Sequence, residues 1–210
     1  MSPRHALASL ALVLPIAAGA VLADDMVAKS AAETKPIKVG TKAPDAAWRG
    51  TDGKSTSLKQ VTAGKPTVLI FYRGSWCPFC NAHLSDLARV EGQLRSMGYQ
   101  IVAVSPDKPE KLKPMEDKDK LTYRLYSDTT AETFKKFGVA FRVDDGTYDK
   151  YKNSFKLDLE KESGATHHIL PVPSVFLLDK SGKIVFEYTN PDYKIRMKGD
   201  DIVAAAKSAK

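Results

Sequence analysis

The stretch Pro66-Thr-Val-Leu-Ile-Phe-Tyr-Arg-Gly-Ser-Trp-Cys-Pro-Phe-Cys-Asn-Ala-His83 decides the fold of this chain. Its first part, residues 67–72, is β-branched, aromatic and apolar on both faces, which is typical of a central strand covered on both sides. A short loop follows, and the apolar spacing then predicts a helix over residues 78–97. Proline fits the first position of a helix, because its missing N–H would have no partner there. Cys77 is therefore expected to be the N-cap residue, with Cys80 one turn along the same face.

The two cysteines of this stretch are the only ones in the chain. The thiolate is the nucleophile in thiol chemistry, and the partial positive charge of a helix N-terminus lowers the pKa of a thiol. We expect Cys77 to be the activated sulfur and Cys80 to resolve a mixed disulfide or a sulfenic acid. A structural disulfide is the alternative, but a bridge between Cys77 and Cys80 would close a loop too short to constrain the unfolded chain much. The pair therefore predicts a redox-active centre.

The start of the chain has the pattern of a secretory signal peptide. Arg4 precedes an apolar core over residues 6–16, and small residues fill positions 17–23. The core is too short to cross a membrane and stay there, although an uncleaved anchor is the alternative. We expect cleavage after Ala23, export to the periplasm of a bacterium, and no stable membrane insertion. Residues 24–38 are rich in Ala and Lys and are expected to be a flexible lead-in.

Composition fits one soluble domain over residues 39–210. The chain has 210 residues, 43% of them apolar, and a net charge of +7 at pH 7. A chain of this size can bury a real core. The lysines are spread among acids rather than gathered in one block, so a solvated surface explains the charge and a nucleic-acid partner is not expected.

The remaining segments complete an α/β domain. An Asp-Gly turn at residues 51–54 predicts an N-terminal hairpin. A second apolar strand over 99–104 follows the long helix, which makes a right-handed unit with parallel strands. Residues 140–168 are interpreted as an insertion packed on the domain. A strand over 173–179, its antiparallel partner over 183–188 and a last helix over 201–209 end the chain.

This order of elements resembles the thioredoxin fold, and more closely the peroxiredoxin-like branch of the alkyl hydroperoxide reductase C / thiol-specific antioxidant family. The resemblance implies a central mixed sheet flanked by helices and the reduction of peroxides. It also implies recycling by a thioredoxin-like partner and no bound cofactor. The matching motifs are Ala43-Pro44-Asp45, Phe71-Tyr-Arg-Gly-Ser-Trp-Cys-Pro-Phe-Cys80 with its C-P-F-C core, Tyr126-Ser-Asp128, Phe137-Gly138, Leu170-Pro-Val-Pro-Ser-Val-Phe-Leu-Leu-Asp179, Pro191-Asp-Tyr193 and Arg196.

The resemblance further implies that Pro173 is a cis proline beside the cysteine pair, in front of the strand that follows the insertion. The backbone of Val172 would then be open to a substrate peptide as an added strand. An ordinary proline at the start of a strand is the alternative.

The chain departs from the typical peroxiredoxin pattern around the cysteines. Alignment on Phe71 and Tyr72 puts Cys80 on the peroxide-reacting position, Cys77 in place of the family's Thr and Arg73 in place of its Pro. Pro173 stands where the family has an Arg, which removes a cation that would hold the peroxide. These departures favour disulfide exchange and leave open which sulfur meets peroxide. Arg73 is expected either to stabilise a thiolate or to pair with an acid.

Two other functions compete with peroxide reduction. One is a periplasmic thiol-disulfide oxidoreductase that acts on protein disulfides. The other is a copper- or zinc-binding protein, because Cys77, Cys80 and His83 have metal-ligand spacing and His167-His168 could add to them. A proline over the cysteines would hinder a metal, so none is expected.

The residues that flank the cysteines are open to two interpretations. Pro78 supports the start of the helix. Trp76 and Phe79 either pack at the end of the strand or form an apolar rim that shields the sulfurs and contacts a partner.

Overall fold

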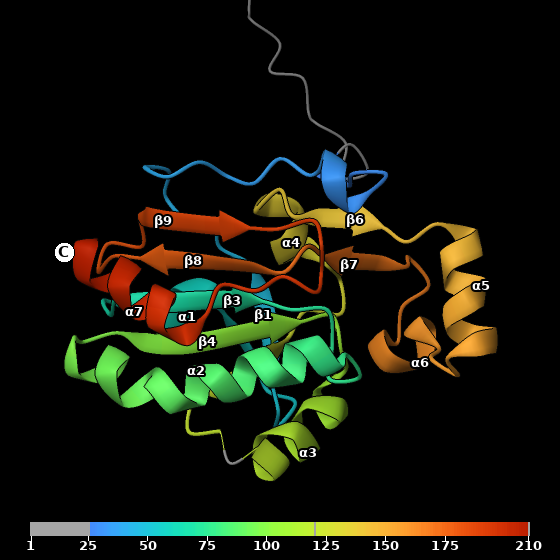
Figure 1. Ribbon diagram of the computed structural model, residues 1–210, viewed down its shortest axis with the longest axis horizontal. Helices are drawn as coiled ribbons and strands as arrows, with labels where there is room; N and C mark the ends of the chain where they lie inside the picture. The colour runs from blue at the N-terminus through green and yellow to red at the C-terminus, as the bar shows by residue number, and fades with distance from the viewer. Residues whose placement is uncertain (1–25, 120, 210) are drawn as a thin grey trace, which may run out of the picture.

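The computed structural model describes residues 26–119 and 121–209 (Figure 1). The signal peptide predicted at residues 1–23 lies outside this part of the chain. Within the part that is described, no helix is long and apolar enough to cross a membrane.

A seven-stranded mixed sheet forms the centre of the molecule, in the order β2-β1-β5-β4-β3-β8-β9. β3 pairs in parallel with β4 and antiparallel with β8, which confirms the predicted parallel unit. All five residues of β3 are buried, as expected for a strand with both faces covered. The strands are β1 (Ala47–Gly50), β2 (Ser55–Ser57), β3 (Thr67–Phe71), β4 (Gln100–Ser105), β5 (Arg124–Ser127), β8 (Ser174–Leu178) and β9 (Ile184–Thr189). β1 and β2 form the predicted N-terminal hairpin.

Helices cover both faces of the sheet and divide its core in two. On one face, α2 (Pro78–Ser96) and α7 (Gly199–Ser208) pack over Val68, Ile70 and Tyr72. On the other face, α1 (Leu58–Thr62) and α4 (Glu132–Lys136) pack over Leu69 and Phe71. α3 (Pro109–Asp119) connects β4 to β5. The alternation of side chains along β3 thus sends neighbouring residues into different cores.

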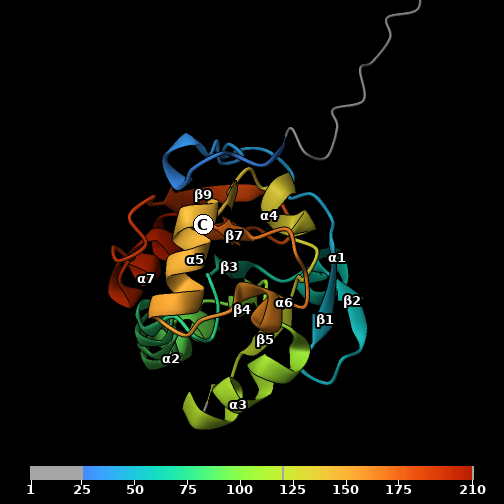
Figure 2. The same cartoon turned by 90° about the vertical axis from the view of Figure 1, so that its right-hand side faces the viewer.

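The predicted insertion forms a separate lobe at the end of the sheet where α2 begins (Figures 1 and 2). The predicted range 140–168 contains β6 (Ala140–Arg142), α5 (Asp145–Ser154) and α6 (Leu159–Ser163), and β7 (Ile169–Pro171) follows directly after it. β6 and β7 pair with each other in a second, two-stranded sheet. We call residues 143–168 the cap. Val143, Tyr148 and Leu159 of the cap form an apolar cluster with Leu170 of β7, against which Trp76 packs.

The flexible lead-in expected at residues 24–38 is not what the structure shows for residues 26–38. The backbone N–H groups of Ala28, Lys35 and Ile37 donate to carbonyls of residues 137–140 at 3.0 Å. A 3₁₀ turn, η2 (Ala31–Glu33), lies between these contacts. The apolar side chains of Val27 and Ile37 pack against the second core. The Ala- and Lys-rich composition concealed this docking, because backbone hydrogen bonds leave little trace in sequence.

The cis proline expected at Pro173 is also wrong, because no peptide bond in residues 26–119 and 121–209 is cis. Residues 169–178 run as one extended path from the pairing with β6 to the pairing with β3. The backbone of Val172 is already occupied: its N–H donates to the Val139 carbonyl at 2.8 Å, and its carbonyl accepts from the Ser174 hydroxyl at 2.7 Å. Val172 is 0% exposed. It therefore cannot offer an added strand to a peptide in this conformation.

Candidate active site

The cysteine pair lies at the carboxyl end of β3, at the first turn of α2. Cys77 is the N-cap residue, with φ −90° and ψ 114°, and Pro78 occupies the first helical position as predicted. The N–H of Cys77 donates to the Gly74 carbonyl at 3.1 Å, and the N–H of Cys80 donates to the Cys77 carbonyl at 3.0 Å. Both sulfurs are reduced, and the residues are 1% and 0% exposed. The pair is thus covered by the protein and not displayed on its surface.

The two thiols differ in acidity. The pKa of Cys77 is lowered to about 6, first by a hydrogen bond from the Cys80 thiol and then by the Cys80 backbone N–H and the charges of Arg73 and Arg196. Burial opposes this shift. Burial is instead the main cause that raises the pKa of Cys80, and the Cys77 thiolate adds to it. Near neutral pH this favours a thiolate on Cys77. The direction agrees with the sequence expectation, but its main cause is the Cys80 thiol, with the N–H of Cys80 in the first helical turn as a smaller one.

Arg196 reaches the pair from the loop between β9 and α7. Its Nη2 donates to the Cys80 Sγ at 3.5 Å, and its Nη1 donates to the carbonyls of Tyr193 and Ile195. Pro173 carries no charge, but this guanidinium supplies a cation to the sulfurs from another part of the chain. The two guides to the peroxide-reacting sulfur disagree, because Arg196 contacts Cys80 while the lowered pKa belongs to Cys77. The lowered pKa favours Cys77, since a thiol must ionise before it attacks.

Arg73 lies in a cage of aromatic rings above the cysteine loop. Its guanidinium carbon is 5.0 Å from the Trp76 ring centroid, 5.7 Å from that of Tyr151 and 4.2 Å from that of Tyr193. Its Nη2 donates to the Tyr151 hydroxyl at 2.6 Å, and its Nε has no partner. The residue is only 4% exposed. Such contacts hold a cation in place without neutralising it.

Neither guanidinium at the site is joined to an acid by an ion pair within the described residues. Arg73 is thus not paired with a carboxylate there, and its charge is among the causes that lower the pKa of Cys77. A buried cation without a counter-ion is costly, and an anion beside it offsets that cost. The site is consequently built for a negative charge on sulfur or oxygen.

A buried carboxylate holds the loop in front of the cysteines. The Asp107 Oδ2 accepts hydrogen bonds from the Ser75 N–H at 2.6 Å and from the Ser105 hydroxyl at 3.1 Å. Gly74 passes close to it with φ +153°, where a Cβ atom would lie 2.2 Å from the Trp76 Nε1 and 2.8 Å from the Asp107 Oδ1. A side chain at this position would collide with Trp76 and Asp107, so the close approach of the loop requires glycine.

The aromatic residues beside the cysteines have different surroundings. Trp76 is half-buried between the cap cluster and the main core, so packing accounts for most of its contacts. Phe79 is 40% exposed and makes an edge contact with Tyr193, at 5.7 Å between ring centroids. Ile195 is exposed in the same loop as Tyr193. Phe79 therefore belongs to an apolar rim outside the sulfurs.

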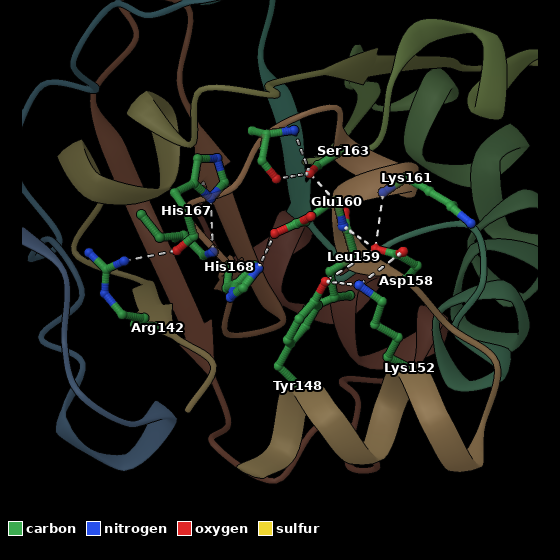
Figure 3. Close-up of polar contacts among 12 residues, drawn as sticks. Arg142, Tyr148, Lys152, Asp158, Leu159, Glu160, Lys161, Ser163, His167 and His168 are labelled. Atoms are coloured by element: carbon green, nitrogen blue, oxygen red, sulfur yellow. Dashed lines mark hydrogen bonds and ion pairs between the residues drawn. The ribbon is translucent and has the colours of Figure 1, made fainter. Parts of the chain in front are cut away.

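The histidines do not form a metal site with the cysteines. Among the described residues, no three His, Cys, Asp or Glu side chains are grouped to hold a metal ion. Burial, and after it the charge of Arg196, lowers the pKa of His83 to about 4. That positive charge would also repel a metal ion. His167 and His168 lie in the cap (Figure 3), where His168 stacks on Tyr148 at 3.9 Å and contacts Glu160 at 2.9 Å.

Sequence reasoning missed Tyr151, Tyr193 and Asp107 as site residues and gave Arg196 no role. Tyr193 and Arg196 were visible only as a motif near the end of the chain. Asp107 carried a usable signal, because a polar residue just after the buried strand next to β3 lies at the same edge of the sheet. Tyr151 carried none, since nothing in the cap sequence shows that α5 folds back over Arg73. Pro173 does lie at this end of the sheet, just before Ser174, which pairs with Phe71.

Sequence comparison relates this chain to known proteins. The model of the AhpC/TSA family matches residues 39–187. Peroxiredoxin Bcp of Escherichia coli K12 is 30% identical over 104 residues, which are 50% of this chain and 66% of that protein. A Mycobacterium tuberculosis CDC 1551 protein, named provisionally as a peroxiredoxin, is 28% identical over 158 residues, 75% of this chain and 88% of its own length.

Solved structures agree in fold. Peroxidoxin BcpB from Mycobacterium tuberculosis superposes with a TM-score of 0.63 at 18% identity, covering 83% of this chain and 99% of that one. A peroxiredoxin-like protein from Aquifex aeolicus superposes with a TM-score of 0.66 at 19% identity, covering 84% of this chain and 90% of that one. At these identities the structures demonstrate the fold alone. Because the family model spans well over half of the chain, the protein belongs to the AhpC/TSA family, as a peroxiredoxin-like member of the thioredoxin superfamily.

Proposed function

We propose that the protein is a thiol-dependent peroxidase in which Cys77 attacks the peroxide and Cys80 closes a disulfide. The observation that carries this proposal is the site itself. The pKa of Cys77 is lowered to about 6, the Cys80 thiol is hydrogen-bonded to it, and the guanidiniums of Arg73 and Arg196 lie nearby without an ion-pair partner among the described residues. Membership of the AhpC/TSA family and likeness to proteins named peroxiredoxins support it.

The reaction proceeds in three balanced steps. The Cys77 thiolate attacks the distal oxygen of the peroxide, the O–O bond breaks, and the released alkoxide or hydroxide takes up a proton, which leaves Cys77 as a sulfenic acid. The Cys80 sulfur then attacks the Cys77 sulfur, the S–O bond breaks and water leaves. A dithiol partner, which we propose to be a thioredoxin-like protein, returns two electrons and two protons to the disulfide.

Burial of the sulfurs favours a small substrate over a protein disulfide. At 1% and 0% exposure, Cys77 and Cys80 are out of reach of another protein's disulfide until the loop with Tyr193 and Arg196 moves. A hydroperoxide needs only a narrow passage. The reductant must displace that loop, and the exposed side chains of Phe79, Tyr193 and Ile195 give it an apolar surface to contact.

Arg196 removes the reason to expect a weak peroxidase. An arginine missing at Pro173 would take away a donor aimed at developing negative charge, which commonly costs about two to three orders of magnitude in rate. Arg196 restores a guanidinium at the sulfurs. We therefore infer that peroxide reduction is the main activity and disulfide exchange a slower one.

We also propose that the protein is exported and works in the periplasm. The signal-peptide pattern of residues 1–23 supports export. The chain also has only two cysteines, both free for redox chemistry. Mass spectrometry of the purified secreted protein should find Asp24 at the N-terminus. An intact Met1 on a membrane-held product would contradict cleavage.

The proposal is tested by mixing reduced protein with hydrogen peroxide and, separately, with an oxidised protein disulfide, while the loss of free thiols is followed. We expect peroxide to consume both thiols far faster than it consumes free cysteine, and the protein disulfide to react more slowly. Cys77→Ser is the matched control and should abolish the fast reaction. Peroxide consumption no faster than that of free cysteine would transfer the assignment to disulfide reduction.

A further inference from the structure

A side chain of the cap reaches into the active site and contacts Arg73. The Tyr151 hydroxyl accepts a hydrogen bond from the Arg73 Nη2 at 2.6 Å, and the guanidinium carbon lies 5.7 Å from the Tyr151 ring centroid. Tyr151 belongs to α5 and lies 78 positions after Arg73 in the chain. None of the reaction steps above uses this tyrosine.

The orientation of the Arg73 guanidinium depends on this contact. Arg73 is only 4% exposed, and among the described residues the Tyr151 hydroxyl is the one hydrogen-bond acceptor that its side chain reaches. Its Nε is buried without a partner. The rings of Trp76 and Tyr193 attract the positive charge, but they do not fix the direction of the N–H groups. Because the five donors of a guanidinium lie in one plane, a charge-assisted bond to a single acceptor orients all of them.

The cap is anchored to the domain by contacts that do not involve Arg73. The Lys108 N–H donates to the Glu162 carbonyl at 2.9 Å, just after β4. The Nε2 of His167 contacts the Thr129 carbonyl at 2.9 Å, just after β5. The cap is thus held at the carboxyl ends of the two strands that follow β3 in the sheet. It can therefore hold the Tyr151 hydroxyl in a fixed place.

We propose that the cap completes the active site, and that Tyr151 is a positioning residue which fixes the Arg73 guanidinium beside the loop that presents Cys77. This rests on the proposed function, because the group that the charge serves is the thiolate that attacks peroxide. Arg73 and Cys77 lie on the same short connection between β3 and α2. Since aromatic rings and a hydroxyl do not neutralise a cation, its charge remains available to stabilise a negative charge on sulfur.

The acidity of Cys77 is the property that this positioning changes. Its pKa is lowered to about 6, first by the hydrogen bond from the Cys80 thiol, and the charges of Arg73 and Arg196 are among the further causes. The attraction between two charges weakens as they separate, so a guanidinium that turns or shifts loses part of its effect. Arg196 contacts the Cys80 Sγ without any help from the cap. Only the share of Arg73 therefore depends on Tyr151.

The test measures the acid dissociation constant of Cys77 from the thiolate absorbance at 240 nm, and so needs no peroxide. In Arg73→Met, which keeps an unbranched side chain in the cage, we expect this constant to fall about tenfold, at the low end for the loss of one nearby opposite charge. Tyr151→Phe keeps the ring and removes the acceptor, so we expect a fall of about threefold, half of the Arg73 effect on a logarithmic scale.

Tyr148→Phe is the matched control for Tyr151→Phe. Tyr148 lies on the same helix, but its hydroxyl contacts Asp158 and Lys152 within the cap (Figure 3). The same substitution there should leave the acid dissociation constant of Cys77 unchanged. A fall as large as that in Tyr151→Phe would show a general effect of the cap and overturn the role of the Tyr151 hydroxyl.

The double variant Arg73→Met/Tyr151→Phe separates positioning from damage to the fold. If Tyr151 acts through Arg73, adding Tyr151→Phe to Arg73→Met should not lower the constant further. A further threefold fall in that background, or an unchanged constant in Tyr151→Phe alone, overturns the proposal. If the constants change as expected but peroxide consumes the thiols no faster than it consumes free cysteine, only the proposed function is overturned.

Discussion

The buried Asp107 makes a prediction about stability that does not depend on catalysis. Its pKa is raised from the ordinary 3.8 to about 7, mainly because burial disfavours the charged form. A group with a raised pKa in the folded state contributes stability below its unfolded pKa, and that contribution is lost as the pH rises through the folded pKa. The stability contributed by the protonated carboxyl is therefore complete below pH 3.8 and lost through about pH 7.

The size of the effect follows from the same shift. At about 1.4 kcal/mol for each unit, a pKa raised from 3.8 to about 7 amounts to about 4 kcal/mol over the whole range. About 3 kcal/mol of this falls between pH 5 and pH 8. Asp107→Asn removes the titration but keeps an oxygen that can accept from the Ser75 N–H. The variant should therefore lack this component of the pH dependence.

Urea unfolding of the reduced protein at pH 5 and pH 8 measures this contribution of Asp107 to the free energy of unfolding. The free energy of unfolding of the unaltered protein, taken relative to Asp107→Asn, should fall by about 3 kcal/mol between these two pH values. Taking the difference removes the titrations of Cys77 and His83, which both proteins share. Parallel pH dependences in the two proteins would refute the reasoning, because Asp107 would then ionise in the folded state as it does in water.

Three further predictions concern the sulfurs and their loop. We expect Cys80→Ala to raise the pKa of Cys77, measured from the thiolate absorbance at 240 nm, and Cys80→Ser to raise it less because a hydroxyl donor remains. Equal pKa values of Cys77 in the two variants would deny the hydrogen bond its role. Arg196→Ala should slow the peroxide step by about two orders of magnitude and Arg196→Lys by less, in stopped-flow fluorescence, and unchanged rates would show that the guanidinium acts elsewhere. Gly74→Ala should lower the unfolding midpoint and the peroxide rate together, since its Cβ would lie 2.2 Å from the Trp76 Nε1, and an unaltered variant would mean that the loop can adjust.

The β3–α2 segment shows what the sequence could predict. Its strand, the Pro78 start and the N-cap position of Cys77 all follow from local rules, because each depends on residues within one or two turns. The parallel pairing of β3 with β4 followed from the length of the crossover helix. The hairpin likewise followed from its Asp-Gly turn.

The parts that could not be predicted depend on contacts between distant segments. Arg196 lies 116 positions after Cys80, and Tyr151 lies 78 positions after Arg73, yet each pair is joined by a hydrogen bond. No periodicity records such a contact. The trans geometry of Pro173 was missed for a related reason, since the hydrogen bond between the Val172 N–H and the Val139 carbonyl fixes that segment from outside.

The central claim is that Cys77 is the sulfur that attacks peroxide. Reduced Cys77→Ser and Cys80→Ser proteins should each be treated with hydrogen peroxide and dimedone, which labels sulfenic acids, and then analysed by mass spectrometry. In the Cys80→Ser protein a hydroxyl can still donate to Cys77 and the charges of Arg73 and Arg196 remain, so one dimedone adduct should form on Cys77. Little should form on Cys80 in the Cys77→Ser protein, because burial raises the pKa of Cys80. A rapid adduct on Cys80 in the Cys77→Ser protein, with none on Cys77, would contradict the account and make Cys80 the peroxide-reacting residue.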